Sequence, residues 1–236
     1  MAENPQNFEK QPAALEAQPE RMDSPLSSGG DRFQAPDNIN NLISKERAND
    51  NGQGPALSGK ESASLNAWRT FPNPADEQFR NLQEKSLLAQ NKLGPELSAQ
   101  EQAQLYAKLT FPEARDEQYR KLHEKNLLAD RGGGPELTKD EKARLYSKFA
   151  FPEAKDEGYR ILHEREMKGT DPLSEREQSR LSSKRAFPNN EQARQLWEQD
   201  LNARKNLGPE LTREEKFTLQ EAFARQHARE VARQRK

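Results

Sequence analysis

Two histidines at equivalent positions of a repeated sequence, His123 and His163, are the first side chains that could bind a metal. The same position is Gln83 in an earlier repeat and Trp197 in a later one, and a ligand site would not accept these residues. The third histidine, His227, lies in a basic tail without a second ligand. We therefore interpret His123 and His163 as half-buried packing residues, and we predict no bound metal and no cofactor.

Repeated Asp-Glu pairs are the next candidates, because neighbouring carboxylates can act as acid and base. Each pair falls where a helix is expected to begin, and the helix dipole favours negative charge there without any catalytic role. The run Gly132–Gly134 lacks the frame of a phosphate-binding loop. The chain has no cysteine, and no serine stands out with a paired histidine. We therefore predict that the protein is not an enzyme and has no catalytic residue.

The C-terminal tail is the strongest chemical signal in the chain. Its basic residues are Arg225, Arg229, Arg233, Arg235 and Lys236. The first three are four residues apart and share one face of a helix, so they could contact nucleic-acid phosphates weakly and in a salt-sensitive manner. The overall pI of about 6.4 argues against a dedicated nucleic-acid-binding protein. Basic residues also suit the end of an ordinary solvated helix.

The last dozen residues resemble the loose, Arg-rich C-terminal signals of substrates of bacterial type IV secretion. That resemblance implies a protein that is delivered outside the cell through a specialised route. Low apolar content, the absence of cysteine and joints between modules suit such a delivered protein, either a secreted effector or a virion-internal protein. We keep this as an alternative function.

These residues are carried by a sequence that recurs with a period of about 40 residues. Each copy starts near a Gly-Pro or Asp-Pro pair, and the most similar copies begin at Gly94 and Gly134. We divide the chain into a disordered leader, four repeats and a half repeat with a basic C-terminal helix. The boundaries are 1–52 for the leader, 53–93, 94–133, 134–170 and 171–207 for the repeats, and 208–236 for the half repeat.

The first helix of each repeat begins with a capping box, in which a Ser or Thr and a Glu three residues later satisfy backbone donors. The five pairs are Ser58/Glu61, Ser98/Glu101, Thr138/Glu141, Ser174/Glu177 and Thr212/Glu215. Ala103, Leu105, Tyr106 and Leu109 are predicted to form one face of such a helix. A Phe-Pro pair ends the helix in four repeats, since proline excludes its predecessor from the helical region. We expect each of these phenylalanines to wedge a corner of the core.

The second helix follows a short loop, which is two residues shorter in the fourth repeat. Its predicted N-caps are Asp76, Asp116, Asp156 and Asn190. Helix-forming residues dominate the composition, and the chain has one valine and three isoleucines, so strands are not expected. The predicted fold is therefore all-α: tandem helical hairpins of about 37–40 residues, either stacked as a solenoid or arranged as beads on a string.

The leader, residues 1–52, has the composition of a disordered segment, with nine acidic and five basic residues in its first 50 positions. One exception is the stretch around Ile39, Leu42 and Ile43, which could form a short helix that docks on the repeats or on a partner. The N-terminus does not read as a secretory signal, and no apolar run is long enough to span a membrane. We predict a soluble protein that is cytoplasmic as synthesised.

The main functional hypothesis is a multivalent scaffold or adaptor that binds a repetitive or multi-copy protein partner. The predicted contact residues are Tyr106, Tyr146, Tyr119, Tyr159, Arg120 and Arg160, which recur between repeats two and three. The alternative for these residues is a place in the core between repeats. The sequence does not indicate an oligomeric state.

Overall fold

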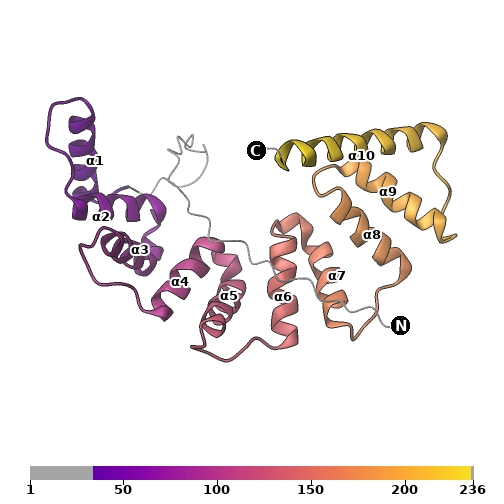
Figure 1. Cartoon of the computed structure of the whole chain (residues 1–236), viewed down its shortest axis with the longest axis horizontal. Helices are drawn as coiled ribbons and strands as arrows, with labels where there is room; N and C mark the ends of the chain where they lie inside the picture. Colours follow the sequence, from indigo (N-terminus) through magenta and orange to yellow (C-terminus); the bar gives the residue numbers. More distant parts are fainter. Residues whose placement is uncertain (1–33, 235–236) are drawn as a thin grey trace. The chain divides into compact units, whose positions relative to one another are not determined.

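The computed structural model describes residues 34–234, which fold into ten α-helices and contain no strand (Figure 1). The first helices of the repeats are α2 (Gly59–Thr70), α4 (Ala99–Thr110), α6 (Lys139–Ala150), α8 (Glu175–Ala186) and α10 (Arg213–Gln234). The second helices are α3 (Glu77–Gln90), α5 (Glu117–Asp130), α7 (Glu157–Lys168) and α9 (Glu191–Arg204), and α1 (Asp37–Asp50) precedes them all. The predicted all-α fold of paired helices is confirmed.

The capping boxes are present at all five first helices. At α6, for example, the Thr138 backbone N–H donates to the Glu141 carboxylate over 2.8 Å, and the Glu141 N–H donates to the Thr138 hydroxyl over 3.3 Å. The same reciprocal bonds join Thr212 and Glu215 before α10. Each of the other first helices ends at the phenylalanine of a Phe-Pro pair, as predicted.

The hydrophobic core consists of clusters that cross the boundaries between repeats. Phe111, at the end of α4, packs with Tyr119 and Leu122 of α5 and with Leu137 and Leu145 of the following repeat. The other three phenylalanines before proline, Phe71, Phe151 and Phe187, lie in equivalent clusters, each at most 4% exposed. The predicted corner wedges are thus confirmed. Because neighbouring repeats share each cluster, the packing is that of a solenoid rather than of separate beads.

Helix α1 lies within the predicted disordered leader and packs against α2. Ile39 is 4% exposed, and the Lys45 ammonium lies 2.7 Å from the Glu61 carboxylate. Lys85 and Glu101 form the same ion pair between α3 and α4, so α1 packs on α2 as a second helix packs on the first helix of the next repeat. Residues 37–50 are therefore helical rather than disordered, and the exception expected around Ile39 is docked on the repeats over a longer helix than predicted. The disorder predicted at 1–33 lies outside the described residues.

Helix α10 differs from the other first helices on the face that would receive a second helix. In α6 that face carries the small residues Ala143 and Ser147, and the Ser147 hydroxyl contacts His163 of α7 over 3.1 Å. In α10 the same two positions are Phe217, which is 62% exposed, and Glu221. This face of α10 therefore carries larger side chains than the equivalent face of α6.

Candidate functional site

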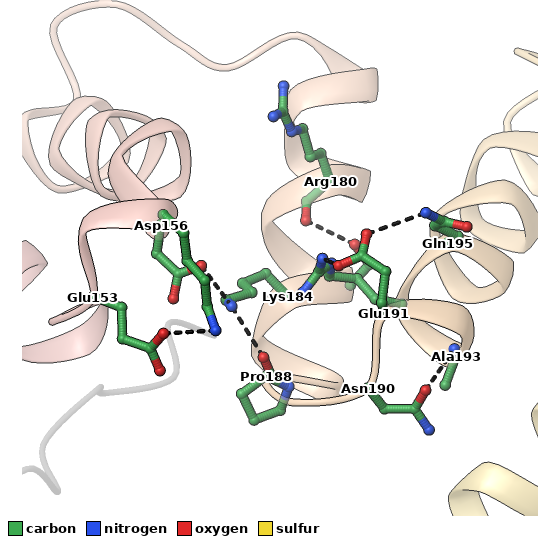
Figure 2. Close-up of polar contacts among 12 residues, drawn as sticks. Glu153, Asp156, Arg180, Lys184, Pro188, Asn190, Glu191, Ala193 and Gln195 are labelled. Carbon is green, nitrogen blue, oxygen red and sulfur yellow. Dashed lines mark hydrogen bonds and ion pairs between the residues drawn. The ribbon is translucent and has the colours of Figure 1, made fainter. Parts of the chain in front are cut away.

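Three buried lysines join consecutive repeats. Lys148 of α6 lies 2.8 Å from the Asp116 carboxylate of the preceding repeat and donates to the Pro152 carbonyl over 2.9 Å. Lys108 pairs in the same way with Asp76, and Lys184 pairs with Asp156. Figure 2 shows Lys184 between Asp156 and the Pro188 carbonyl. A buried ammonium is stable only when it is paired and hydrogen-bonded, and each of these lysines has both kinds of contact.

The aspartates in these pairs do not cap their helices as predicted. No side-chain hydrogen bond from Asp76, Asp116 or Asp156 reaches the backbone at the helix start. Each lies instead at the end of a 3₁₀ turn, namely Pro74–Asp76, Ala114–Asp116 and Ala154–Asp156. Asn190, where the loop is shorter, does cap α9, because its side chain accepts from the Ala193 N–H over 3.1 Å. The longer loops, with their two extra residues, thus form the 3₁₀ turn, and the aspartate at its end pairs with the lysine of the next repeat.

Four of the six predicted contact residues belong to the packing between repeats. Tyr119 is half-buried, and the Lys148 ammonium and the Arg160 guanidinium lie 5.4 and 5.6 Å from its ring centre. Arg160 is 7% exposed, and Arg120 lies in the same way over Phe79. Tyr159 is covered by Arg180, Lys184 and Arg194. These cation–π contacts stabilise the junctions and leave the four side chains little surface for a partner.

The other two predicted residues, Tyr106 and Tyr146, are exposed. Tyr106 is 52% exposed and lies one turn before Leu109, which is 43% exposed. In the next repeat Tyr146 and Phe149 are 44% and 42% exposed. Residues three apart share one side of a helix, so α4 and α6 each present an aromatic and apolar pair to solvent. We call these two pairs the Tyr surfaces.

The Tyr surfaces correct the predicted helix face. Ala103 and Leu105 are buried, whereas Tyr106 and Leu109 are exposed. The side of α4 that faces the preceding repeat is occupied by Lys108, which is buried against Asp76, so Tyr106 and Leu109 lie on another side. A periodic pattern assigns the apolar residues to the core and the lysine to solvent, so it missed Leu109 and Phe149 as exposed residues. The available signal was the recurrence of Lys108 as Lys148 and Lys184, three residues before the Phe-Pro pair in each case.

A groove of about 490 Å³ adjoins the first Tyr surface between α3 and α4. Its lining includes Leu97, Leu105, Tyr106, Leu109, Gln83 and Gln102. The equivalent space between α5 and α6 is occupied differently, since Phe149 packs edge-on against His123 at a ring distance of 5.3 Å. At the junction between repeats three and four, Arg185 pairs with Glu166 at the same place. Between α3 and α4 the position of His123 is taken by Gln83 and that of Phe149 by Leu109, and this groove stays open.

The two equivalent histidines lie in packing positions. His123 is edge-on to Phe111, and burial lowers the pKa of its imidazole. Burial and the nearby Arg185 cation lower the pKa of His163, which is edge-on to Phe151 and contacts Ser147. A lowered pKa favours the neutral imidazole, and both rings pack as neutral, flat side chains against the phenylalanines of the core. Within residues 34–234, no cluster of His, Asp and Glu has the arrangement of a metal site.

The predicted basic stripe forms one side of α10. Arg225, Arg229 and Arg233 are exposed and line a hollow that faces the fourth Phe-Pro corner. Arg235 and Lys236 lie outside the described residues. Across the described part of the chain, no helix is both long and apolar enough to span a membrane.

The chain matches no protein-family model, and comparisons with curated proteins and with solved structures found no match either.

Proposed function

We propose that this protein is a non-enzymatic scaffold that binds a protein partner through the two Tyr surfaces. The observation that carries the proposal is the recurrence of an exposed Tyr and a large apolar residue, three positions apart, on α4 and on α6. Tyrosine is enriched in protein interfaces because its ring buries apolar area while its hydroxyl keeps a hydrogen bond. Single exposed apolar residues are normal on protein surfaces, but four large side chains grouped in two equivalent pairs indicate an interaction surface.

The repeats on either side lack this pattern. The positions of Tyr106 and Leu109 are taken by Asn66 and Arg69 in the first repeat. They are taken by Ser182 and Arg185 in the fourth, and both arginines pair with glutamates. The proposed binding surface thus belongs to repeats two and three. We therefore expect two contacts per chain, and a repetitive or multi-copy partner would gain avidity from engaging both.

The two surfaces are similar but not equal. At α4 the open groove could receive an apolar anchor of the partner beside Tyr106. At α6 the same space is filled by the Phe149 and His123 rings. Anchors that fill a pocket dominate interface energies, so we expect the α4 surface to be the tighter of the two contacts.

The proposal is tested with full-length protein and a Tyr106→Ala/Tyr146→Ala variant in quantitative affinity capture. The control variant is Leu93→Ala/Ile161→Ala, which removes two similarly exposed apolar side chains elsewhere. We expect a defined partner to be retained by wild type and control and lost from the tyrosine variant. Circular dichroism should show equal helix content in all three. Equal retention of the same partner by the tyrosine variant would refute the proposal.

A delivered protein is the second candidate, because each junction rests on a cluster of only three or four buried side chains. Thin clusters of this kind would let the repeats unfold one after another during transport. Its test is a thermal melt of the full chain. A broad transition supports this candidate, and a steep cooperative transition at high temperature counts against it.

A further inference from the structure

The junction before α10 contains a hollow of about 620 Å³ and lacks the buried lysine that the junctions between repeats one to four have. On one side it is lined by Arg225, Arg229 and Arg233 of α10. On the other it is lined by Pro188, Asn189, Asn190 and Gln192 of the fourth Phe-Pro corner. The hollow therefore lies between a cationic helix face and a row of amide side chains.

Two changes in the repeat explain why the hollow exists. The lysine position of α6, Lys148, is Ala222 in α10, so no side chain crosses the junction. The fourth loop is two residues shorter and forms no 3₁₀ turn, so Asn190 replaces the aspartate and caps α9 instead. Both partners of the buried pair are thus absent at this junction, and α10 continues past the point where the other first helices end, so its arginines line the hollow.

The charge in the hollow is predominantly positive. Arg225 shares its charge with Glu221, at a distance of 3.1 Å. Arg229 and Arg233 are exposed, and neither forms an ion pair with a carboxylate whose side chain the structure describes. The hollow thus presents two further exposed guanidinium groups, and guanidinium binds carboxylate or phosphate in a bidentate manner.

We propose that this hollow binds an acidic peptide segment in an extended conformation. Arginines four residues apart are separated by about 6 Å along a helix, because the rise is ~1.5 Å per residue. Side chains on one face of an extended peptide are separated by about 6.6 Å, because the rise is ~3.3 Å per residue. Glutamates at alternate positions could therefore meet successive arginines. The amides of Asn189 and Gln192 on the opposite side can bond the peptide backbone.

Single-stranded nucleic acid fits the hollow less well. Proteins that bind single strands provide exposed aromatic rings on which bases stack. The only ring among the lining residues is that of Phe187, which is 3% exposed. The chain's own leader fits less well too, since its acidic residues are never two positions apart within 1–33. The site is separate from the Tyr surfaces and does not depend on the scaffold proposal.

The test uses the full chain and a short fluorescein-labelled peptide with Glu alternating with Ser, followed by fluorescence anisotropy at ~0.15 M ionic strength. The control peptide carries Gln in place of Glu. We expect the acidic peptide to bind and the control peptide not to bind. The variant Arg229→Gln/Arg233→Gln should weaken binding about tenfold, which corresponds to two exposed charge pairs. The variant Lys60→Gln/Lys139→Gln makes the same change in net charge outside the hollow and should not weaken it.

Other outcomes would overturn the proposal. Equal weakening by both double variants would mean that net charge, not the hollow, attracts the peptide. Tighter binding of an oligothymidylate than of the acidic peptide, with loss in the arginine variant, would assign the site to nucleic acid. A severalfold gain in peptide affinity on deletion of residues 1–33 would show that the leader occupies the hollow. No binding of the acidic peptide at all would refute the proposal directly.

Discussion

The junction between repeats two and three and the junction before α10 join the same kinds of helix by different means. In the former, Lys148 spans the boundary to Asp116 and lies over the Tyr119 ring. Within the described residues, the latter has no such ion pair and keeps the aromatic contacts alone: Phe223 packs edge-on against Phe187 and Trp197, at ring distances of 4.7 and 5.2 Å. Phe149 packs in the equivalent place against Phe111 and His123 in the former. Where the lysine is absent its aspartate is absent too, since either one alone would be a buried, unpaired charge.

The inner junction therefore has an ion pair in addition to its aromatic contacts, whereas the last junction, as far as the structure describes it, has the aromatic contacts without the ion pair. A buried ion pair depends on direction and distance, so it holds each repeat in one register relative to the next. An aromatic cluster tolerates a wider range of positions and leaves the polar side chains at its rim exposed. The inner junctions are thus suited to holding the repeats together, whereas the last junction keeps open surface.

The largest expected effect comes from cavities in the two junctions. Leu145→Ala at the inner junction should lower the free energy of unfolding by about 4 kcal/mol, because the leucine is 1% exposed and its surroundings cannot collapse. Leu219→Ala at the last junction should cost less, about 2 kcal/mol, because water already reaches the adjacent hollow. Urea unfolding followed by circular dichroism measures both. Equal losses would show that the last junction is packed as tightly as the inner one.

Removal of the buried lysine should have a similar but smaller effect. Lys148→Met leaves the Asp116 carboxylate, whose side chain is 12% exposed, without its partner, and should cost about 3 kcal/mol. Adding Asp116→Asn removes the unpaired charge and should recover at least half of that loss. The same urea experiment applies, with Lys139→Met as an exposed control. If the double variant were as unstable as the single one, packing rather than charge would explain the lysine.

The smallest effect concerns pH. Hydrogen bonds from the Lys125 ammonium and from the Thr138 backbone N–H lower the pKa of Glu141 from 4.5 to about 2. A depressed pKa contributes stability above pH 4.5, and that contribution is lost as the pH falls toward 2. Glu215 at the last junction has a pKa lowered only by its own capping box, because no lysine reaches it.

Glu141→Gln should therefore flatten the loss of stability between pH 4.5 and 2 more than Glu215→Gln does. Carboxyl carbon shifts in an NMR titration provide the direct measurement. A Glu215 pKa as low as that of Glu141 would contradict the proposed difference between the junctions.

Local signals made much of this fold predictable. A capping box and a Phe-Pro pair act within a few residues, so Thr138, Glu141 and Phe151 indicated where α6 begins and ends. The burial of Lys148 was not predictable in this way, because a lysine in a helix is ordinarily solvated. The stretch around Ile39 was expected as a short helix that docks either on the repeats or on a partner, and only packing decided between them, because α2 covers Ile39.

For the candidate sites, too, the sequence indicated which residues matter but not which of them are exposed. Tyr106 and Tyr146 were found from composition and repetition, because large aromatic residues in a polar chain are few. Their exposure, and the burial of Tyr119 and Arg160, depend on which side of each helix the next repeat covers. The amino-acid order alone therefore specified the helices, their caps and the period. Only packing across repeat boundaries decided which side chains became core and which became surface, because burial depends on distances between residues far apart in the chain.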